Sequence, residues 1–257
     1  MFTKPSYIYQ LHKALYGLKQ TPRAWFHRMS TFLLSVGFQI SKADPFLFIY
    51  HHVGHIIYFL LYVDDIVVTS SNDELLQNFI DFLGHSFDIK DLGPLNYFLG
   101  LQVTSIPEGI HINQLKYARV ILEKHDLLHS QPVSTPLSAK ANLSSTEGTL
   151  LDNPTMFCEM VGSLQYLTIT RPDIAFAVNS VSQYMCQPRS THLIAAKRIL
   201  RYVKGTLGYG LRFLAQQPPV HVSAYSDTDW ASCPESRRST SSYLIYIRGN
   251  LVFSCSN

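Results

Sequence analysis

The sequence predicts an α+β fold, and two observations lead to this class. Segments with helical spacing of apolar residues follow helix-start signals, and between them lie short runs rich in Ile, Phe, Tyr and Val that end at turn residues. In addition, 46% of the 257 residues are hydrophobic and 15% are charged, which excludes disordered and fibrous classes. The chain is long and apolar enough to bury a substantial core.

The first hundred residues supply a helix, three strands and a second helix. Thr21 is the expected N-cap of the first helix and Pro22 its first residue. A capping box at Ser71–Glu74 predicts the start of the second helix. The strands, joined by turns near His51–Gly54 and at Asp64-Asp65, are expected at Pro45–Tyr50, His55–Val63 and Ile66–Thr69.

The remaining residues predict a hairpin, several helices and a final group of strands. Leu99–Val103 and Gly109–Ile112 form the expected hairpin, and a helix follows to about Asp126. Ser130–Asn153 is rich in Pro, Ser, Thr and Asn and is the expected linker. Helices are then expected from Pro154 to Ile169, from Pro172 onward and over Thr191–Lys204, and strands over Val220–Ser226, Ser242–Arg248 and Leu251–Cys255.

Charge is distributed unevenly along the chain. Residues 1–42 carry six Lys or Arg and no acid (+6), residues 43–170 carry a net −9, and residues 171–257 carry a net +6. Basic flanks around an acidic centre suit a polyanion held against carboxylates that bind metal ions. The alternative is that the charges only solvate separate faces.

Cysteine spacing and hydropathy restrict the class further. The four cysteines lie far apart and form no C-x-x-C pair, so we expect free thiols rather than a disulfide framework or zinc site. The longest apolar run, Ile56–Val63, is too short to cross a membrane. No secretory leader pattern is recognisable at the start, so we expect an intracellular protein without membrane partners.

The pair Asp64-Asp65 is the sharpest chemical feature. It lies between two almost wholly apolar strands, which we expect to be buried on both faces. Asp-Asp is a poor choice for a tight hairpin loop, where Asn-Gly or Asp-Gly supplies the required positive φ. Paired carboxylates bind Mg²⁺ together with substrate phosphates, whereas the alternative for an isolated Asp-Asp is an ordinary exposed turn.

Motifs in this context resemble the reverse transcriptases of copia-type LTR retrotransposons. Tyr62-Val63-Asp64-Asp65 resembles the polymerase motif of this family. Further stretches resemble family segments in the same order: Ala14–Trp25; Asp91–Gly100; Val161–Leu167 with Thr170–Ala175 and Lys197–Tyr202; and Ala224–Ala231 with Arg237–Ser241. The resemblance implies a polymerase palm containing the Asp64-Asp65 hairpin over 1–104, a mostly helical thumb or connection region over 105–217, and the start of an RNase H-like sheet over 218–257.

The resemblance also implies roles for individual residues. Asp64 and Asp65 would hold the catalytic Mg²⁺ ions, and Asp227 would be the first metal ligand of RNase H. Lys19 and Arg23 would lie near template or nucleotide phosphate, although both also fit solvated helix charges. The primer end would be held by Phe98, Leu99 and Gly100, of which the first two also fit plain core positions.

A basic stripe points independently to nucleic acid. Lys197, Arg201 and Lys204 are spaced i, i+4, i+7 and therefore share one face of the expected helix. Such a stripe can follow a phosphate backbone without reading sequence, whereas the alternative is a solvated face.

The chain also departs from the family pattern. The family has a further catalytic carboxylate on a strand near the start of the polymerase, but no Asp or Glu precedes Asp44 in this sequence. The later acids of the RNase H site are not found either. We therefore expect a product truncated at both ends that binds an RNA or DNA primer–template but does not polymerise deoxynucleotides alone. The alternatives are a catalytically dead nucleic-acid-binding remnant or one that co-assembles with an intact polymerase and interferes with it.

Overall fold

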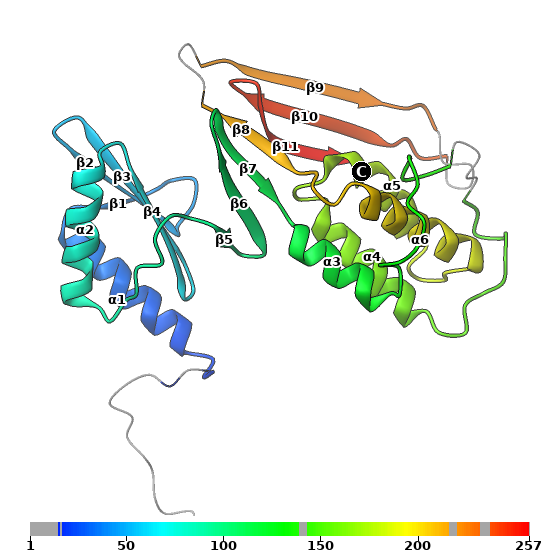
Figure 1. The fold of residues 1–257 in the computed structure, drawn as a ribbon, viewed down its shortest axis with the longest axis horizontal. Helices are drawn as coiled ribbons and strands as arrows, with labels where there is room; N and C mark the ends of the chain where they lie inside the picture. Colours follow the sequence, from blue (N-terminus) through cyan, green and yellow to red (C-terminus); the bar gives the residue numbers. More distant parts are fainter. Residues whose placement is uncertain (1–14, 16, 139–142, 216–219, 232–236, 257) are drawn as a thin grey trace, which may run out of the picture. The chain divides into compact units, whose positions relative to one another are not determined.

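The computed structural model describes residues 15, 17–138, 143–215, 220–231 and 237–256. The chain divides into two compact units, Met1–Leu95 and Asn96–Asn257. Each unit contains helices and antiparallel strands around its own hydrophobic core, which confirms the α+β class (Figure 1). The boundaries predicted for the palm, the connection region and the RNase H-like part remain predictions.

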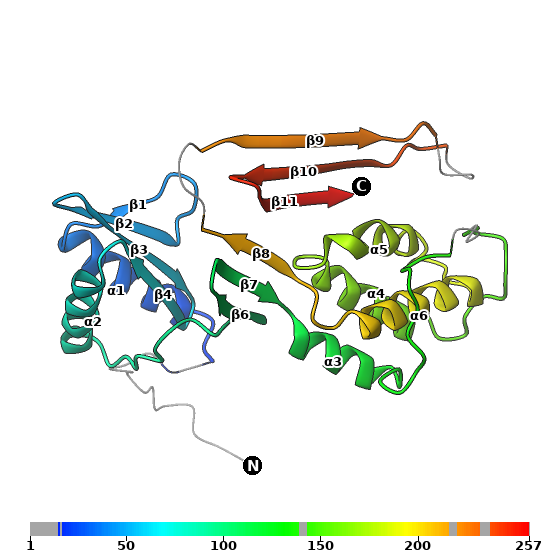
Figure 2. The same ribbon diagram turned by 45° about the horizontal axis from the view of Figure 1, so that its top comes forward.

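The first unit is an antiparallel sheet with two helices. The strands follow the order β1-β2-β3-β4, with bounds Gln39–Ile40, Leu47–His52, His55–Tyr62 and Asp65–Ser70. The helices are α1 (Thr21–Ser35) and α2 (Asp73–Ser86), which lie against the sheet in both ribbon views (Figures 1 and 2). Their buried side chains share one core with those of the sheet: Met29, Leu33, Phe38, Phe48, Ile57, Phe59, Leu61, Phe79, Leu83 and Phe87.

Both predicted helix starts in this unit need a correction of one residue. Helix α1 has Gln20 as its N-cap, and the Thr21 hydroxyl donates to the Leu15 carbonyl at 2.6 Å instead of capping. Helix α2 is capped by Asn72, whose Oδ1 accepts from the Leu75 amide at 2.8 Å. Ser71 is not available as that cap because its hydroxyl accepts from the backbone amide of Ile56, which belongs to β3.

The second unit begins with another antiparallel sheet, in the order β5-β6-β7-β8. The strands are β5 (Tyr97–Phe98), β6 (Leu101–Ile106), β7 (Gly109–Asn113) and β8 (Leu211–Leu214). The short strand β8 was not predicted, because it pairs with β7 from about a hundred residues further along the chain. Leu99, predicted to lie in a strand, instead belongs to the turn between β5 and β6.

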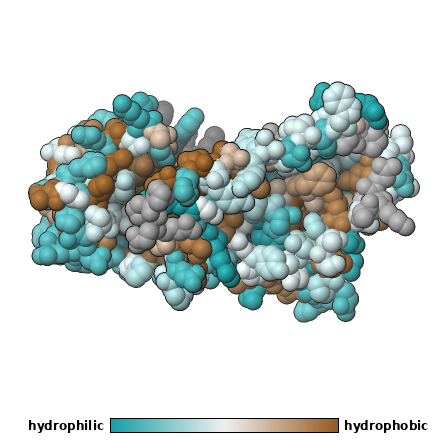
Figure 3. All heavy atoms as spheres, turned by 90° about the horizontal axis from the view of Figure 1, so that it is seen from above, coloured by the Kyte–Doolittle hydropathy of each residue, from teal (hydrophilic) through white to brown (hydrophobic). Residues whose placement is uncertain are grey.

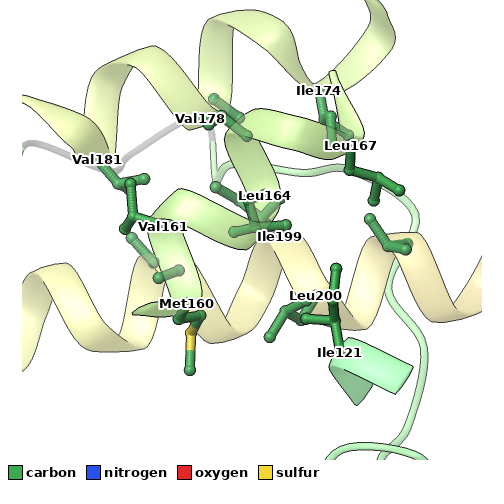
Figure 4. Close-up of a cluster of buried hydrophobic side chains, with 14 of the residues drawn as sticks. Ile121, Met160, Val161, Leu164, Leu167, Ile174, Val178, Val181, Ile199 and Leu200 are labelled. Atoms are coloured by element: carbon green, nitrogen blue, oxygen red, sulfur yellow. The ribbon is translucent and has the colours of Figure 1, made fainter. Parts of the chain in front are cut away.

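Helices form the core of this unit. They are α3 (Leu115–Lys124), α4 (Thr155–Leu167), the short 3₁₀ helix η1 (Pro172–Ile174), α5 (Ala175–Ser182) and α6 (Ser190–Gly205). Figure 4 shows how Leu164 and Val161 of α4 meet Val178 of α5 and Ile199 of α6 between the helices. All four side chains are buried, so the helices pack through one continuous apolar interior.

The last strands form a separate sheet within the second unit. The order is β11-β10-β9, from β9 (Val222–Thr228), β10 (Ser241–Ile247) and β11 (Asn250–Ser256), and β11 lies beside β8 (Figure 2). The Asn250 side chain connects the two sheets, since its Oδ1 accepts from the Leu214 amide at 2.8 Å and its Nδ2 donates to the Leu214 carbonyl at 3.0 Å. An amide side chain therefore takes the place of a strand partner at the edge of β8.

Surface properties vary over the molecule. Figure 3 shows hydrophobic side chains reaching the surface in several separate places among hydrophilic ones. Strand β9 is exposed along its whole length, and Trp230 just beyond it is 93% exposed. Within the described part of the chain, no helix is both long and apolar enough to cross a membrane. Cys158, Cys186 and Cys255 are not in disulfide bonds, and Cys233 lies outside the described residues.

Candidate active site

The β3–β4 hairpin presents Asp64 and Asp65 at its tip. Tyr62 pairs with Asp65 across the ladder, so the loop consists of Val63 and Asp64, and Asp65 is the first residue of β4. The predicted turn at Asp64-Asp65 is therefore wrong by one residue. Val63 has a φ of 51°, which is rare for a β-branched residue. Two-residue hairpin loops take such angles because the twist of the strands requires them.

The hairpin arms are buried on one face only, so the prediction of burial on both faces is wrong. In β3 the side chains of Ile57, Phe59 and Leu61 are buried in the core, whereas Tyr58 and Tyr62 are 42% and 47% exposed. The tyrosines explain the difference, since a phenol has an apolar ring but a hydroxyl that favours water. The core therefore anchors the hairpin through alternate residues and leaves its other face open.

Both carboxylates are exposed to solvent. Mg²⁺ prefers oxygen ligands and retains several waters, so an exposed pair of carboxylates fits its donor preference. Asp44 precedes β2 near the same end of the sheet, but its Oδ1 accepts from the Phe46 amide at 2.8 Å and closes a local turn. Among the described residues, no group of three or more His, Cys, Asp or Glu could hold a metal ion. Asp64 and Asp65 therefore fit part of a metal site.

Lys19 and Arg23 lie at the start of α1 and are both exposed. The ion pairs Lys124–Glu159 and Arg171–Asp173 involve neither of them. The first turn of α1 also contains no acid. The positions suit contact with phosphate, and they equally suit solvation.

The predicted primer-contact residues form a tight turn in the second unit. Phe98 ends β5, while Leu99 and Gly100 occupy the loop with φ angles of 48° and 81°. Leu99 is exposed, and Phe98 is half-buried. The Tyr166 hydroxyl of α4 donates to the Leu99 carbonyl at 2.6 Å, a contact between residues 67 apart that was not predicted.

The basic stripe of α6 is partly used by the chain itself. Lys197 is exposed. The Arg201 guanidinium, however, donates to the Gln131 carbonyl at 2.7 Å. Lys204 donates to the carbonyl of Ser130, the residue before Gln131. The start of the predicted linker therefore lies against this face of the helix. Of the three cations, Lys197 remains the one without such a backbone contact.

Asp227 lies on β9, directly opposite Ser242 in the ladder with β10, and its side chain is exposed. The neighbouring acid Asp229 has a structural contact, because its Oδ1 accepts from the Thr240 amide at 2.6 Å. Asp227 is therefore the acid on this strand that is presented to solvent.

Arg171 is a buried charged residue that was not predicted to matter, and only 3% of it is exposed. Its guanidinium donates to both carboxylate oxygens of Asp173, at 2.8 and 2.7 Å, and to the Thr206 carbonyl at 3.0 Å. Burial raises the pKa of Asp173, but hydrogen bonds and charge from Arg171, with a hydrogen bond from Tyr202, outweigh it and hold this pKa below its ordinary value. The signal in the sequence is an Arg and an Asp flanking Pro172 in an apolar stretch.

Comparison with known proteins decides the family. The sequence profile of the family described as Reverse transcriptase (RNA-dependent DNA polymerase) matches residues 3–139, more than half of the chain. The chain belongs to the reverse transcriptase family. This confirms the resemblance predicted from the motifs around Tyr62–Asp65.

Several individual relatives of the chain are retrotransposon proteins. It is 43% identical over 244 residues to the retrovirus-related Pol polyprotein from transposon RE1 of Arabidopsis thaliana, which covers 95% of this chain but 17% of the relative. The Pol polyprotein from transposon TNT 1-94 of Nicotiana tabacum is 34% identical over 261 residues, covering 97% and 19%. These matches place the chain among copia-type Pol polyproteins, of which it spans about a fifth or less of the length.

Four fifths of a shorter relative is covered by the match. An uncharacterized mitochondrial protein of Arabidopsis thaliana is 45% identical over 195 residues, which is 76% of this chain and 80% of the relative. No solved structure matches the chain at a significant level. The profile match includes the Asp64-Asp65 hairpin and the Leu99-Gly100 turn, whereas the basic stripe and Asp227 lie beyond it. The roles of single residues remain predictions.

Proposed function

We propose that the chain is the RNA-directed DNA polymerase region of a copia-type Pol polyprotein and that Asp64 and Asp65 hold its Mg²⁺ ions. One observation carries this proposal: two adjacent, exposed carboxylates at the tip of a hairpin anchored in the core, inside the stretch matched by the reverse transcriptase profile. When bound, Mg²⁺ stabilises charge on the attacking and leaving oxygens of phosphoryl transfer.

The partner is a primer–template of RNA and DNA, with deoxynucleotides as substrates of the intact polymerase. Lys19 and Arg23 contact phosphate, as their exposure next to α1 allows. Phe98, Leu99 and Gly100 contact the primer end from the β5–β6 turn. Asp64 and Asp65 do not extend a primer without further carboxylates, since catalysis of phosphoryl transfer rests on metal electrostatics and positioning.

The strands after β8 are proposed to begin an RNase H-like domain, with Asp227 as its first metal ligand. Support comes from the antiparallel order β11-β10-β9 and from the exposed position of Asp227 on β9. The domain limits 1–104, 105–217 and 218–257 belong to the same proposal.

A binding measurement tests the metal site without requiring polymerisation. The affinity of the chain for a fluorescent DNA primer on an RNA template is measured in Mg²⁺ and in monovalent salt of equal ionic strength. The wild-type chain is expected to bind more tightly in Mg²⁺. In the double variant Asp64→Asn/Asp65→Asn, binding without Mg²⁺ is equal or tighter, because two negative charges are gone, but the gain from Mg²⁺ is lost.

Asp88→Asn is the control, since Asp88 is another exposed carboxylate of the same unit, and its loss removes one negative charge where the double variant removes two. This control is expected to keep the gain from Mg²⁺. If the double variant keeps it as well, Asp64 and Asp65 do not hold the metal ion. Absence of any gain in the wild-type chain contradicts the proposal equally.

A further inference from the structure

Tyr166 joins α4 to the turn of the β5–β6 hairpin. Its hydroxyl donates to the Leu99 carbonyl at 2.6 Å across 67 residues of sequence. A Cβ added at Gly100 would lie 2.7 Å from the same hydroxyl, which is closer than any real Cβ contact allows. The tyrosine therefore approaches the turn only because residue 100 is glycine.

The turn itself is unfavourable for its first residue. Leu99 and Gly100 have φ angles of 48° and 81°, the pattern of a type I′ hairpin loop, in which both central residues have positive φ. Asn or Asp is the usual first residue of this loop, and leucine rarely takes such an angle. The hydrogen bond from Tyr166 helps to hold this conformation, while the Leu99 side chain remains exposed.

Tyr166 is in turn held by its surroundings. Its neighbours on α4, Leu164 and Leu167, are buried in the helical core, which fixes the rotation of this helix. The Tyr117 ring of α3 meets the Tyr166 ring edge-on, with centroids 4.9 Å apart and planes at 84°. Such aromatic pairs have preferred geometries, so Tyr166 has little freedom to move away from the turn.

A second contact connects the same hairpin to α3. The Lys116 ammonium lies over the Tyr97 ring of β5, 5.7 Å from its centroid. Since α3 follows β7, which pairs with β6, the hairpin is connected to the helices through its ladder, through the Tyr166 hydrogen bond and through the Lys116–Tyr97 contact. The Leu99-Gly100 turn is thus a rigid part of the second unit.

We propose that Tyr166 is a positioning residue for primer binding, which fixes the turn so that Phe98 and Leu99 meet the recessed 3′ end of a primer. This inference rests on the proposed function of the turn. With its carbonyl engaged by Tyr166, Leu99 presents its exposed side chain to the ligand. Loss of the hydroxyl loosens the turn but leaves the core of the unit intact, because that hydroxyl is not part of the core.

The test compares two ligands and two variants of the full chain. Affinities are measured for a primer–template with a recessed 3′ end and for a blunt duplex of equal length. Tyr166→Phe is expected to weaken binding of the recessed ligand by about two- to tenfold, the range that one hydrogen bond supplies, and to leave the blunt duplex unchanged. Tyr184→Phe is the matched control, because its hydroxyl also donates to a backbone carbonyl, that of Leu143 at 2.8 Å, away from the hairpin.

Hydrogen exchange of the peptide covering Tyr97–Gln102 gives a readout independent of binding. Exchange is expected to be faster in Tyr166→Phe and unchanged in Tyr184→Phe. Unchanged exchange in Tyr166→Phe, or equal weakening for both ligands, overturns the positioning role. If the wild-type chain does not prefer the recessed end, the proposed primer contact of the turn is wrong and the positioning role falls with it, whereas a preference retained in Tyr166→Phe removes the role of Tyr166 alone.

Discussion

The Arg201 guanidinium donates a hydrogen bond to the Gln131 carbonyl, which lies 70 residues away in sequence. On the same side of α6, Arg198 donates to the Thr135 hydroxyl at 2.9 Å, and Lys204 to the Ser130 carbonyl. Hydrogen bonds from the basic side chains of α6 therefore hold residues 130–135 along this helix. The stripe that the sequence predicted as a phosphate contact has a structural role at two of its three positions.

This division of roles predicts different effects for two alanine variants. Lys197→Ala is expected to reduce the slope of log affinity against log salt by up to about one unit for duplex binding, because an exposed lysine can meet one phosphate. Arg201→Ala is expected to lower the free energy of unfolding by about 1 kcal/mol, since the Gln131 carbonyl loses its donor. Fluorescence anisotropy across a salt series and urea unfolding measure the two quantities. A loss of salt slope in Arg201→Ala as large as that in Lys197→Ala would show that Arg201 also faces phosphate.

Asp173 predicts a stability that depends on pH. Burial raises its pKa, but Arg171 and Tyr202 outweigh burial and hold the folded pKa below the unfolded value of about 3.9. The ionised carboxylate therefore stabilises the fold above that unfolded value, and the stabilisation is lost as the pH falls through the lower folded pKa. Asp173→Asn is expected to lower the free energy of unfolding by about 2 kcal/mol at neutral pH and by much less in strong acid.

Urea unfolding of the wild-type chain and of Asp173→Asn between pH 7 and strong acid measures this difference in the free energy of unfolding. The control is Asp88→Asn, which removes an exposed carboxylate. A difference between wild type and Asp173→Asn that stays constant over the whole range would mean that ionisation of Asp173 contributes nothing.

The contact between Gly100 and Tyr166 predicts that substitutions at these two positions have coupled effects on the free energy of unfolding. Gly100→Ala places a methyl group 2.7 Å from the Tyr166 hydroxyl and also strains a φ of 81°, so it is expected to destabilise the second unit. In a Tyr166→Phe background the clash with the hydroxyl is absent, and only the backbone strain remains. Unfolding of the two single variants and the double variant is expected to show a coupling of about 1 kcal/mol that favours the double variant. Strict additivity would contradict the contact.

The hydrophobic pattern predicted much of the first unit. Met29 and Leu33 in α1, and Phe79 and Leu83 in α2, recur at helical spacing in the sequence, and all four are buried in one core. The bounds of β3 and β4 were also predicted within a residue or two, because the spacing of apolar residues can be read directly from the sequence. Burial on both faces was wrong because two tyrosines were counted as apolar.

The contacts that shape the candidate sites could not be predicted in this way. Tyr166 meets Leu99, Arg201 meets Gln131, and the Asn250 side chain meets Leu214, each at a backbone carbonyl. Every residue has a backbone carbonyl, so the residue type at a position does not show whether its carbonyl accepts such a hydrogen bond. The partners are also 36 to 70 residues apart, beyond the reach of local periodicity.

The position of the bound metal ion tests most directly whether Asp64 and Asp65 hold Mg²⁺. Fe²⁺ replaces Mg²⁺ at oxygen-rich sites and, with ascorbate and peroxide, cleaves the polypeptide next to where it is bound. We expect cleavage within a few residues of Asp64 and Asp65. Excess Mg²⁺ suppresses this cleavage, which disappears in Asp64→Asn/Asp65→Asn and persists in Asp88→Asn. Cleavage elsewhere in the chain, or cleavage at the hairpin that Mg²⁺ does not suppress, would contradict the assignment of these carboxylates as the metal ligands.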